Sequence, residues 1–136
     1  YGFLILLQPT SPLRTEKHIT KSFIEFEKNE TSDSLISVVE ADNLVLKNLV
    51  QRKNGFFEEI DSHGFFSMNR QLLPKLFKPK GAIYIINIKE FLSFGKLISK
   101  NTIPFKMNSE ESLDIDTLED FNLIKNIFKS IWRKKL

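Results

Sequence analysis

The stretch FLILL, Phe3–Leu7, is a continuous apolar run near the start of the chain. Such a run is typical of a β-strand that helices cover on both faces. Thr15 then stands where a helix N-cap is expected, and the residues after it place apolar side chains at helical spacing. A second apolar run, Ser34–Val39, predicts another strand. Strand, helix and strand in this order predict a βαβ unit, and therefore an α/β fold with a mostly parallel sheet flanked by helices.

The segment at about 40–77 follows a different pattern. It consists of short aromatic-rich pieces that are separated by the turn signals Asn54-Gly55 and Asp61–Gly64. Because Asn-Gly favours a tight hairpin, we expect an antiparallel excursion here rather than a second βαβ unit. Its phenylalanines either form an oligomer contact or pack on the domain's own core, and the pattern leaves both open.

The remaining elements complete a single domain over residues 1–136, with the excursion as an insertion. The expected elements are a strand at Gly81–Ile86, a helix at Ile88–Ser99, an edge strand at Pro104–Met107 and a final helix at Leu118–Trp132. Because the apolar run begins almost at Tyr1, we expect the chain to be a piece of a longer polypeptide.

Composition narrows the class of protein. The 136 residues carry 27% charged side chains and a net charge of +3, which is ordinary for one globular domain. Cysteine is absent and only two histidines occur, so disulfides, thiolate sites and a serine-histidine-aspartate triad are disfavoured. No apolar run reaches the roughly 18 residues of a membrane span, and no signal-peptide pattern is present, so a cytoplasmic location is expected.

The segment SLDIDT, Ser112–Thr117, alternates apolar and polar residues as a strand does. In a strand, Asp114 and Asp116 lie on one side, roughly 6.5 Å apart along the chain. Thr117 and Asp120 have the spacing of a helix capping box, with Asp in place of Glu. Paired carboxylates at this position suit a hard cation such as Mg²⁺. The alternative is that Asp116 only caps the helix and Asp114 is solvated.

No glycine-rich phosphate loop is present in this sequence. We therefore expect the main phosphate cradle of any bound nucleotide to lie outside this chain. The five glycines are Gly2, Gly55, Gly64, Gly81 and Gly95.

Four segments together resemble one enzyme family, the CMP-sialic acid synthetases or acylneuraminate cytidylyltransferases. LLQPTSPLR is similar to the family's signature, and the R-Q pair, GAIY and SLDIDT segments follow in the family's order. Together they cover nearly the whole chain. The four segments are Leu6–Arg14, Asn69–Pro74, Gly81–Tyr84 and Ser112–Thr117.

The resemblance implies a partial Rossmann-like nucleotidyltransferase fold, with the excursion at about 40–77 as a dimerisation insertion in a homodimer. It implies transfer of CMP from CTP to N-acetylneuraminic acid or a related nine-carbon acidic sugar, with release of pyrophosphate and dependence on Mg²⁺. The implied partners are therefore CTP and the sugar, with no nucleic acid and no membrane.

The resemblance also implies roles for single residues. Asp114 and Asp116 fall on the family's catalytic, metal-binding aspartates. Each remaining residue has a structural alternative, for example a surface ion pair for the arginine, a core aromatic for the tyrosine and a strand-end cap for the first glutamine. The implied substrate-binding residues are Gln8, Lys47, Arg70, Gln71 and Tyr84.

Three departures from the family's pattern bear on the choice of sugar. Lys80 replaces the asparagine of NGAIY, Phe77 stands where a tyrosine is common, and Leu72 stands where an acidic residue is common. A pseudaminic or legionaminic acid is therefore an alternative substrate. Two other functions stay open. They are a non-catalytic oligomerisation or binding module and, with less support because no aromatic-basic motif is present, a nucleic-acid binder.

Overall fold

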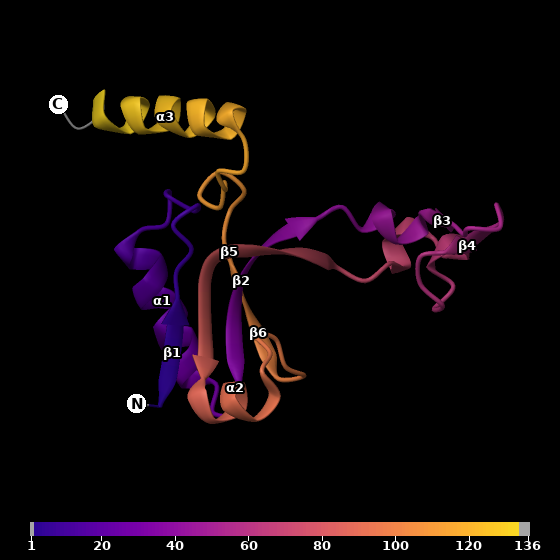
Figure 1. Ribbon diagram of the computed structural model, residues 1–136, viewed down its shortest axis with the longest axis horizontal. Helices are drawn as coiled ribbons and strands as arrows, with labels where there is room; N and C mark the ends of the chain where they lie inside the picture. The colour runs from indigo at the N-terminus through magenta and orange to yellow at the C-terminus, as the bar shows by residue number, and fades with distance from the viewer. Residues whose placement is uncertain (1, 134–136) are drawn as a thin grey trace. The chain divides into compact units, whose positions relative to one another are not determined.

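The structure, a computed structural model, describes residues 2–133 (Figure 1). The chain divides into two compact units. The sheet unit comprises the residues up to Val39 and from Pro79 onward, and the excursion unit comprises Glu40–Lys78.

The main sheet has four strands in the order β1-β5-β2-β6 (Figure 1). Their bounds are Phe3–Leu6 for β1, Ser34–Ala41 for β2, Leu76–Asn87 for β5 and Thr102–Lys106 for β6. β2 and β6 are parallel, whereas β1 and β5 are antiparallel. The fold is α/β, as predicted, but the expectation of a mostly parallel sheet is wrong.

The direction of β5 explains this difference. The Asn87 N–H donates to the Asp33 carbonyl over 2.9 Å, and the Ile83 N–H donates to Ser37 Oγ over 2.9 Å. The end of β5 therefore lies beside the start of β2, which is the antiparallel arrangement. The chain leaves the sheet at the end of β2 and returns in β5 without a crossover helix, and only such a crossover makes consecutive strands parallel.

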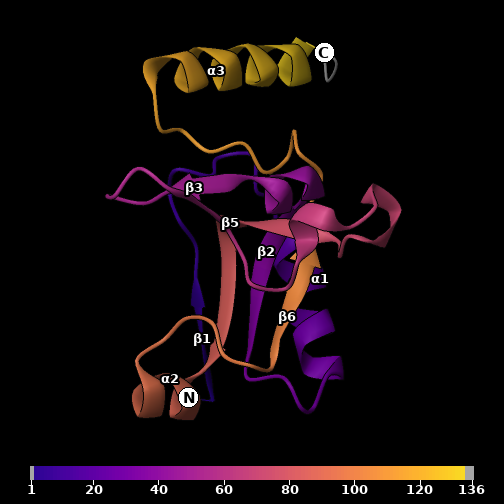
Figure 2. The ribbon, with the colours of Figure 1, turned by 90° about the vertical axis from the view of Figure 1, so that its right-hand side faces the viewer.

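Helix α1, Glu16–Lys28, begins where the sequence predicts it to begin. Thr15 is the N-cap, and its hydroxyl accepts the His18 N–H over 3.4 Å. The His18 ring completes the capping box, because its Nδ1 accepts the Thr15 N–H over 3.2 Å. Figure 2 shows α1 beside β6, and its apolar side packs on the core of the sheet unit. That core consists of Leu35, Ala82, Ile83, Ile85, Phe105 and Met107.

Strand β1 is more exposed than its apolar sequence predicts. All four of its residues are exposed, from 37% for Ile5 to 43% for Leu4. Phe3 packs on one side against Phe23 of α1, with a centroid distance of 4.9 Å. The expectation of helices on both faces is therefore wrong for this strand, which lies at the edge of the sheet.

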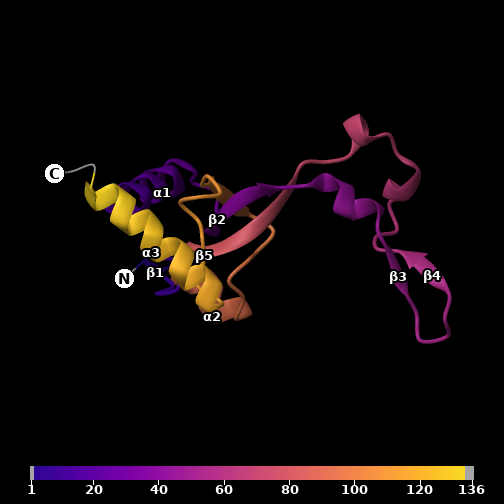
Figure 3. The same cartoon turned by 90° about the horizontal axis from the view of Figure 1, so that it is seen from above.

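The two later helices differ in how well the sequence predicts them. Helix α2, Ile88–Phe94, is shorter than expected because Gly95 ends it in the left-handed conformation, with a φ of 64°. Helix α3, Leu118–Arg133, follows the prediction and is seen along its length in Figure 3. Within the described part of the chain, no helix has the length and apolar character needed to cross a membrane.

The excursion unit contains three short 3₁₀ helices and one small hairpin. β3, Leu49–Gln51, pairs antiparallel with β4, Phe57–Glu59, and Gly55 takes a φ of 88° in the turn. The Asn54-Gly55 hairpin prediction is confirmed. Phe56 and Phe57 are 72% and 66% exposed. The 3₁₀ helices are η1 at Asn43–Lys47, η2 at Phe65–Ser67 and η3 at Arg70–Leu72.

Candidate functional site

The loop that follows β1 is held against β5 by one arginine. Arg14 Nη1 donates to the carbonyl of Gln8 over 2.9 Å and to the carbonyl of Ala82 over 2.8 Å. Both contacts are partly buried. Removing the guanidinium would therefore be destabilising, because it leaves two partly buried carbonyl oxygens without this donor. The arginine of the LLQPTSPLR segment therefore fixes the position of Gln8 over the strand.

Gln8 lies directly on the backbone of Gly81. The Gln8 N–H donates to the Gly81 carbonyl over 3.3 Å. A Cβ placed on Gly81 would lie 1.4 Å from Gln8 Oε1. A side chain on the glycine of the GAIY segment would therefore displace the Gln8 amide.

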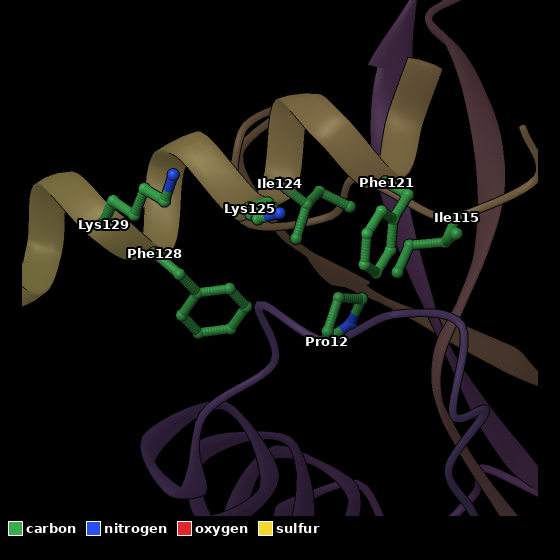
Figure 4. A pocket seen from close by; sticks show the side chains of 7 residues that line it. All are labelled: Pro12, Ile115, Phe121, Ile124, Lys125, Phe128 and Lys129. Atoms are coloured by element: carbon green, nitrogen blue, oxygen red, sulfur yellow. The ribbon is translucent and has the colours of Figure 1, made fainter. Parts of the chain in front are cut away.

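The segment Ser112–Asp116 is not a strand, and that prediction is wrong. Its Ile115 N–H donates to the Thr10 carbonyl over 2.8 Å, so its partner is the irregular loop after β1 and not a strand. A single backbone hydrogen bond does not form the repeated pattern of a β-sheet. The alternation of apolar residues instead serves packing, because Ile115 faces the apolar side of α3 (Figure 4).

The Asp114 carboxylate is held by one hydroxyl and one ammonium. Ser11 Oγ donates to Asp114 Oδ1 over 2.5 Å, and Lys80 Nζ donates to Asp114 Oδ2 over 3.1 Å. The side chains of Lys80 and Asp114 are only 17% and 20% exposed, and Ser11 is fully buried. The alternative of a solvated Asp114 is therefore wrong. Hydrogen bonds to a charged acceptor in such a partly buried place are among the strong ones.

Asp116 is exposed, and the residues after it cap helix α3. The Thr117 N–H donates to Asp120 Oδ2 over 2.8 Å, and the Asp120 N–H donates to Thr117 Oγ1 over 3.2 Å. The predicted capping box is confirmed, so Thr117 and not Asp116 is the N-cap. The Asp116 N–H also donates to Asp120 Oδ2 over 3.2 Å.

Asp114 and Asp116 each offer carboxylate oxygens, the type of ligand that a hard divalent cation prefers. A carboxylate offers about four lone-pair sites, and Asp114 uses two of them for Ser11 and Lys80. Mg²⁺ is usually held by one or two carboxylates and several waters. Residues 2–133 contain no group of three or more histidine or acidic side chains placed for a metal, so a cation held by two carboxylates here would need waters or substrate oxygens as its other ligands.

Tyr84 lies in the middle of β5 and is half-buried. It pairs in register with Leu6 of β1. By the alternation of a strand, Tyr84 and Lys80 point to the same face of β5. The structure thus places Gln8, Tyr84 and Asp114 in the sheet unit, around the β1 loop and β5.

The other three predicted residues lie in the excursion unit. Lys47 ends η1 and is half-buried, whereas Arg70 and Gln71 begin η3 and are exposed. Arg70 Nη2 lies 3.8 Å from Asp42 Oδ1, with both side chains more than 60% exposed, which makes a weak surface ion pair. A shallow pocket of ≈260 Å³ in this unit is lined by Glu40, Ala41, Asp42, Asn43, Arg70, Lys75 and Leu76.

Helix α3 covers the loops that carry Ser11 and Asp114. Figure 4 shows Phe121, Ile124 and Phe128 directed toward Pro12 and Ile115, the neighbours of those two residues. Ile124 is only 3% exposed. An open groove of ≈580 Å³ remains here, with two lysines of α3 at its border; its lining residues are Pro12, Ile115, Phe121, Ile124, Lys125, Phe128 and Lys129.

Sequence reasoning missed three residues of this cluster. Ser11 and Arg14 belong to the quoted signature, but nothing in a local pattern gives them a partner 103 or 68 residues away. Lys80 is recognised only as a departure from the family. No local pattern signals its pairing with Asp114, which lies 34 residues further along the chain.

Comparison with known proteins gives relatives over nearly the whole chain, although no family model matches it. The chain is 32% identical over 133 residues to the N-acylneuraminate cytidylyltransferase of Streptococcus agalactiae, which covers 91% of the chain and 30% of that protein. It is 31% identical to the post-translational flagellin modification protein B of Campylobacter coli and 30% identical to the CMP-N,N'-diacetyllegionaminic acid synthase of Legionella pneumophila. These two matches cover 95% of the chain and 54% and 55% of the relatives.

The chain therefore spans about a third to somewhat over half of the length of these curated relatives. By class, it is related to nucleotidyltransferases. More closely, it is homologous to a segment of the N-acylneuraminate cytidylyltransferases, and the resemblance inferred from the four motifs is confirmed.

The capping carboxylate of α3 gives a prediction about pH. The Thr117 hydroxyl, the N–H groups of Thr117 and Asp116 and, more weakly, the Lys80 charge hold the pKa of Asp120 below its ordinary value of 3.8. Because the folded-state pKa lies below the unfolded one, the ionised cap stabilises the fold above about pH 4. That contribution disappears as the pH falls through the lowered folded-state pKa.

We expect an NMR titration of the metal-free protein to give Asp120 a pKa below 3.8, with the amide shifts of Asp116 and Thr117 following the same curve. Asp120→Asn is the control, because it removes the titrating group and should abolish that step in both amides. A titration of Asp120 at or above 3.8 would contradict the assigned cap.

Proposed function

We propose that the protein containing this chain is a cytidylyltransferase that transfers CMP from CTP to a nine-carbon acidic sugar. One observation carries the proposal. Segments far apart in the sequence, which match the family's motifs, meet in one polar cluster where Gln8 lies on Gly81 and Ser11 and Lys80 hold Asp114. The names of the relatives support the same class of reaction.

The proposed reaction joins the anomeric hydroxyl of the sugar to the α-phosphorus of CTP. The new P–O bond forms as the bond to the β-phosphate breaks, pyrophosphate leaves, and the hydroxyl proton passes to a base or to solvent. Transfer of this kind depends mainly on positioning and on electrostatic stabilisation. Mg²⁺ bound to Asp114 and Asp116 would supply positive charge for the triphosphate and the leaving pyrophosphate.

The chain's own residues have separate tasks in this proposal. Ser11 and Lys80 keep the Asp114 carboxylate in place, and the capping box keeps Asp116 at the start of α3. Gln8 and Tyr84 contact the sugar. The proposed sugar contacts of Lys47, Arg70 and Gln71 rest on the resemblance, supported by the suitability of a guanidinium for a carboxylate.

The sugar itself is a nonulosonic acid in this proposal. Relatives with nearly the same identity to the chain carry the names N-acylneuraminate cytidylyltransferase and CMP-N,N'-diacetyllegionaminic acid synthase. N-acetylneuraminic, legionaminic and pseudaminic acids are thus the substrates to compare.

Substitution of the exposed aspartate tests the reaction. Asp116→Asn should lower pyrophosphate release from CTP, Mg²⁺ and the preferred sugar by about a hundredfold or more, because it removes one carboxylate from the proposed cation site. Glu119→Gln, which removes a neighbouring exposed charge, should leave turnover nearly unchanged. Normal turnover in Asp116→Asn would remove Asp116 from the site. Absence of pyrophosphate release from the intact protein with all three sugars would favour the non-catalytic module.

The Gln8–Gly81 contact gives a second test. Gln8→Ala should raise KM for the acidic sugar about tenfold, because one hydrogen-bonding side chain is lost. Gly81→Ala should give a similar increase by displacing the same side chain, and the double variant should be no worse than either single variant. Gly2→Ala is the matched control, since a Cβ there meets nothing within 4 Å. Additive effects would show that Gly81 acts independently of Gln8.

A homodimer formed through the excursion unit is also part of the proposal. Phe56 and Phe57 are exposed in its hairpin, and aromatic side chains of this kind are typical of interfaces. Light scattering should therefore give twice the chain mass for the intact protein and the single mass for the variant with Phe56→Ser and Phe57→Ser. Phe94→Ser in α2, where the ring is also 68% exposed, should keep the dimer. A monomeric unsubstituted protein would overturn this part.

A further inference from the structure

Lys80 forms an ion pair with Asp114, one of the two proposed metal carboxylates. Its ammonium donates to Asp114 Oδ2 over 3.1 Å, and both side chains are largely buried. Lys80 therefore places a positive charge directly on Asp114.

The backbone around Lys80 fixes where this charge lies. The Lys80 carbonyl accepts a hydrogen bond from Ser37 Oγ over 2.6 Å, which ties this point of β5 to β2. The next residue, Gly81, accepts the Gln8 N–H. With its backbone held on both sides, the lysine side chain starts from a fixed point and ends at Asp114.

We propose that Lys80 is a built-in counter-ion that competes with a divalent cation for Asp114 and thereby weakens the metal affinity of the free protein. The inference rests on the proposed function, because it takes Asp114 and Asp116 as the cation ligands. Lys80 is not a catalytic residue in this inference. It sets the concentration of divalent cation at which the two aspartates are loaded.

Electrostatic interactions explain why Lys80 should weaken the binding of a divalent cation to Asp114. Asp114 keeps unused lone pairs, so a divalent cation binds it either beside the ammonium or after displacing it. In the first case the two cations lie a few ångströms apart and repel each other. In the second case the ammonium loses its partner in a place that is only 17% exposed. Both routes make binding weaker than it would be with a neutral side chain at position 80.

The test measures binding of Mn²⁺, as a probe for Mg²⁺, to the intact protein without nucleotide or sugar. The free-ion signal in electron paramagnetic resonance gives the dissociation constant directly, so the readout does not depend on activity. Lys80→Asn should bind Mn²⁺ at least about tenfold more tightly than the unsubstituted protein. Lys80→Arg, which keeps the charge, should stay within about threefold of it.

Two controls separate local from global effects. Lys89→Asn removes the same charge from an exposed position on α2, beyond the carboxyl end of β5, and should leave the Mn²⁺ affinity unchanged. Asp114→Asn should weaken binding strongly. Lys80→Gln replaces Lys80→Asn if the shorter side chain prevents folding, which circular dichroism reports.

The Mn²⁺ binding test has three outcomes, and each supports or overturns the counter-ion role. Tighter binding in Lys80→Asn, with Lys80→Arg and Lys89→Asn unchanged, supports the counter-ion role. Measurable binding in the unsubstituted protein that is equal or weaker in Lys80→Asn overturns it and leaves the proposed function standing. Absence of Mn²⁺ binding in every variant overturns both the counter-ion role and the assignment of the cation to Asp114 and Asp116, while the pyrophosphate assay still tests the reaction itself.

Discussion

The partly buried Asp114 carboxylate is the group on which the arrangement of this site depends. An ionised carboxylate away from bulk water needs partners, and Asp114 finds a hydroxyl on the loop after β1 and an ammonium on β5. Those two contacts bring the loop before α3 to the carboxyl end of β1. Because Ser11, Lys80 and Asp114 come from three separate parts of the sequence, the loops are positioned relative to one another by charge as well as by packing.

Packing of α3 supports the same arrangement from the apolar side. Pro12 and Ile115 sit next in sequence to the residues of the polar cluster and meet the side chains of Phe121 and Phe128 (Figure 4). The capping box of α3 places the start of this helix directly after Asp116. The acidic segment is thus held by the hydrogen bonds of Asp114 and by the packing of Ile115 beside α3, without forming a β-strand.

These contacts show what individual residues of the family motifs do in the structure. Arg14 of the first motif holds the loop against β5, because it donates to the carbonyl oxygens of Gln8 and Ala82. Gly81 of the GAIY motif lies against the Gln8 amide, which a side chain at this position would displace. Lys80, by contrast, places a cation on the same aspartate that the resemblance assigns to a metal. A departure from a motif is therefore as informative as the motif when its side chain contacts the site.

What the sequence alone determined about this protein is local in origin. The bounds of α1 and α3 follow from capping residues and helical periodicity, and the Asn54-Gly55 turn follows from the φ that glycine permits, all within a few residues of chain. Only the tertiary structure decided the antiparallel direction of β5, the edge position of β1 and the pairing of Lys80 with Asp114. The physical reason is separation in the chain: the two partners lie 34 residues apart, and no local pattern encodes which distant charge a half-buried carboxylate will meet.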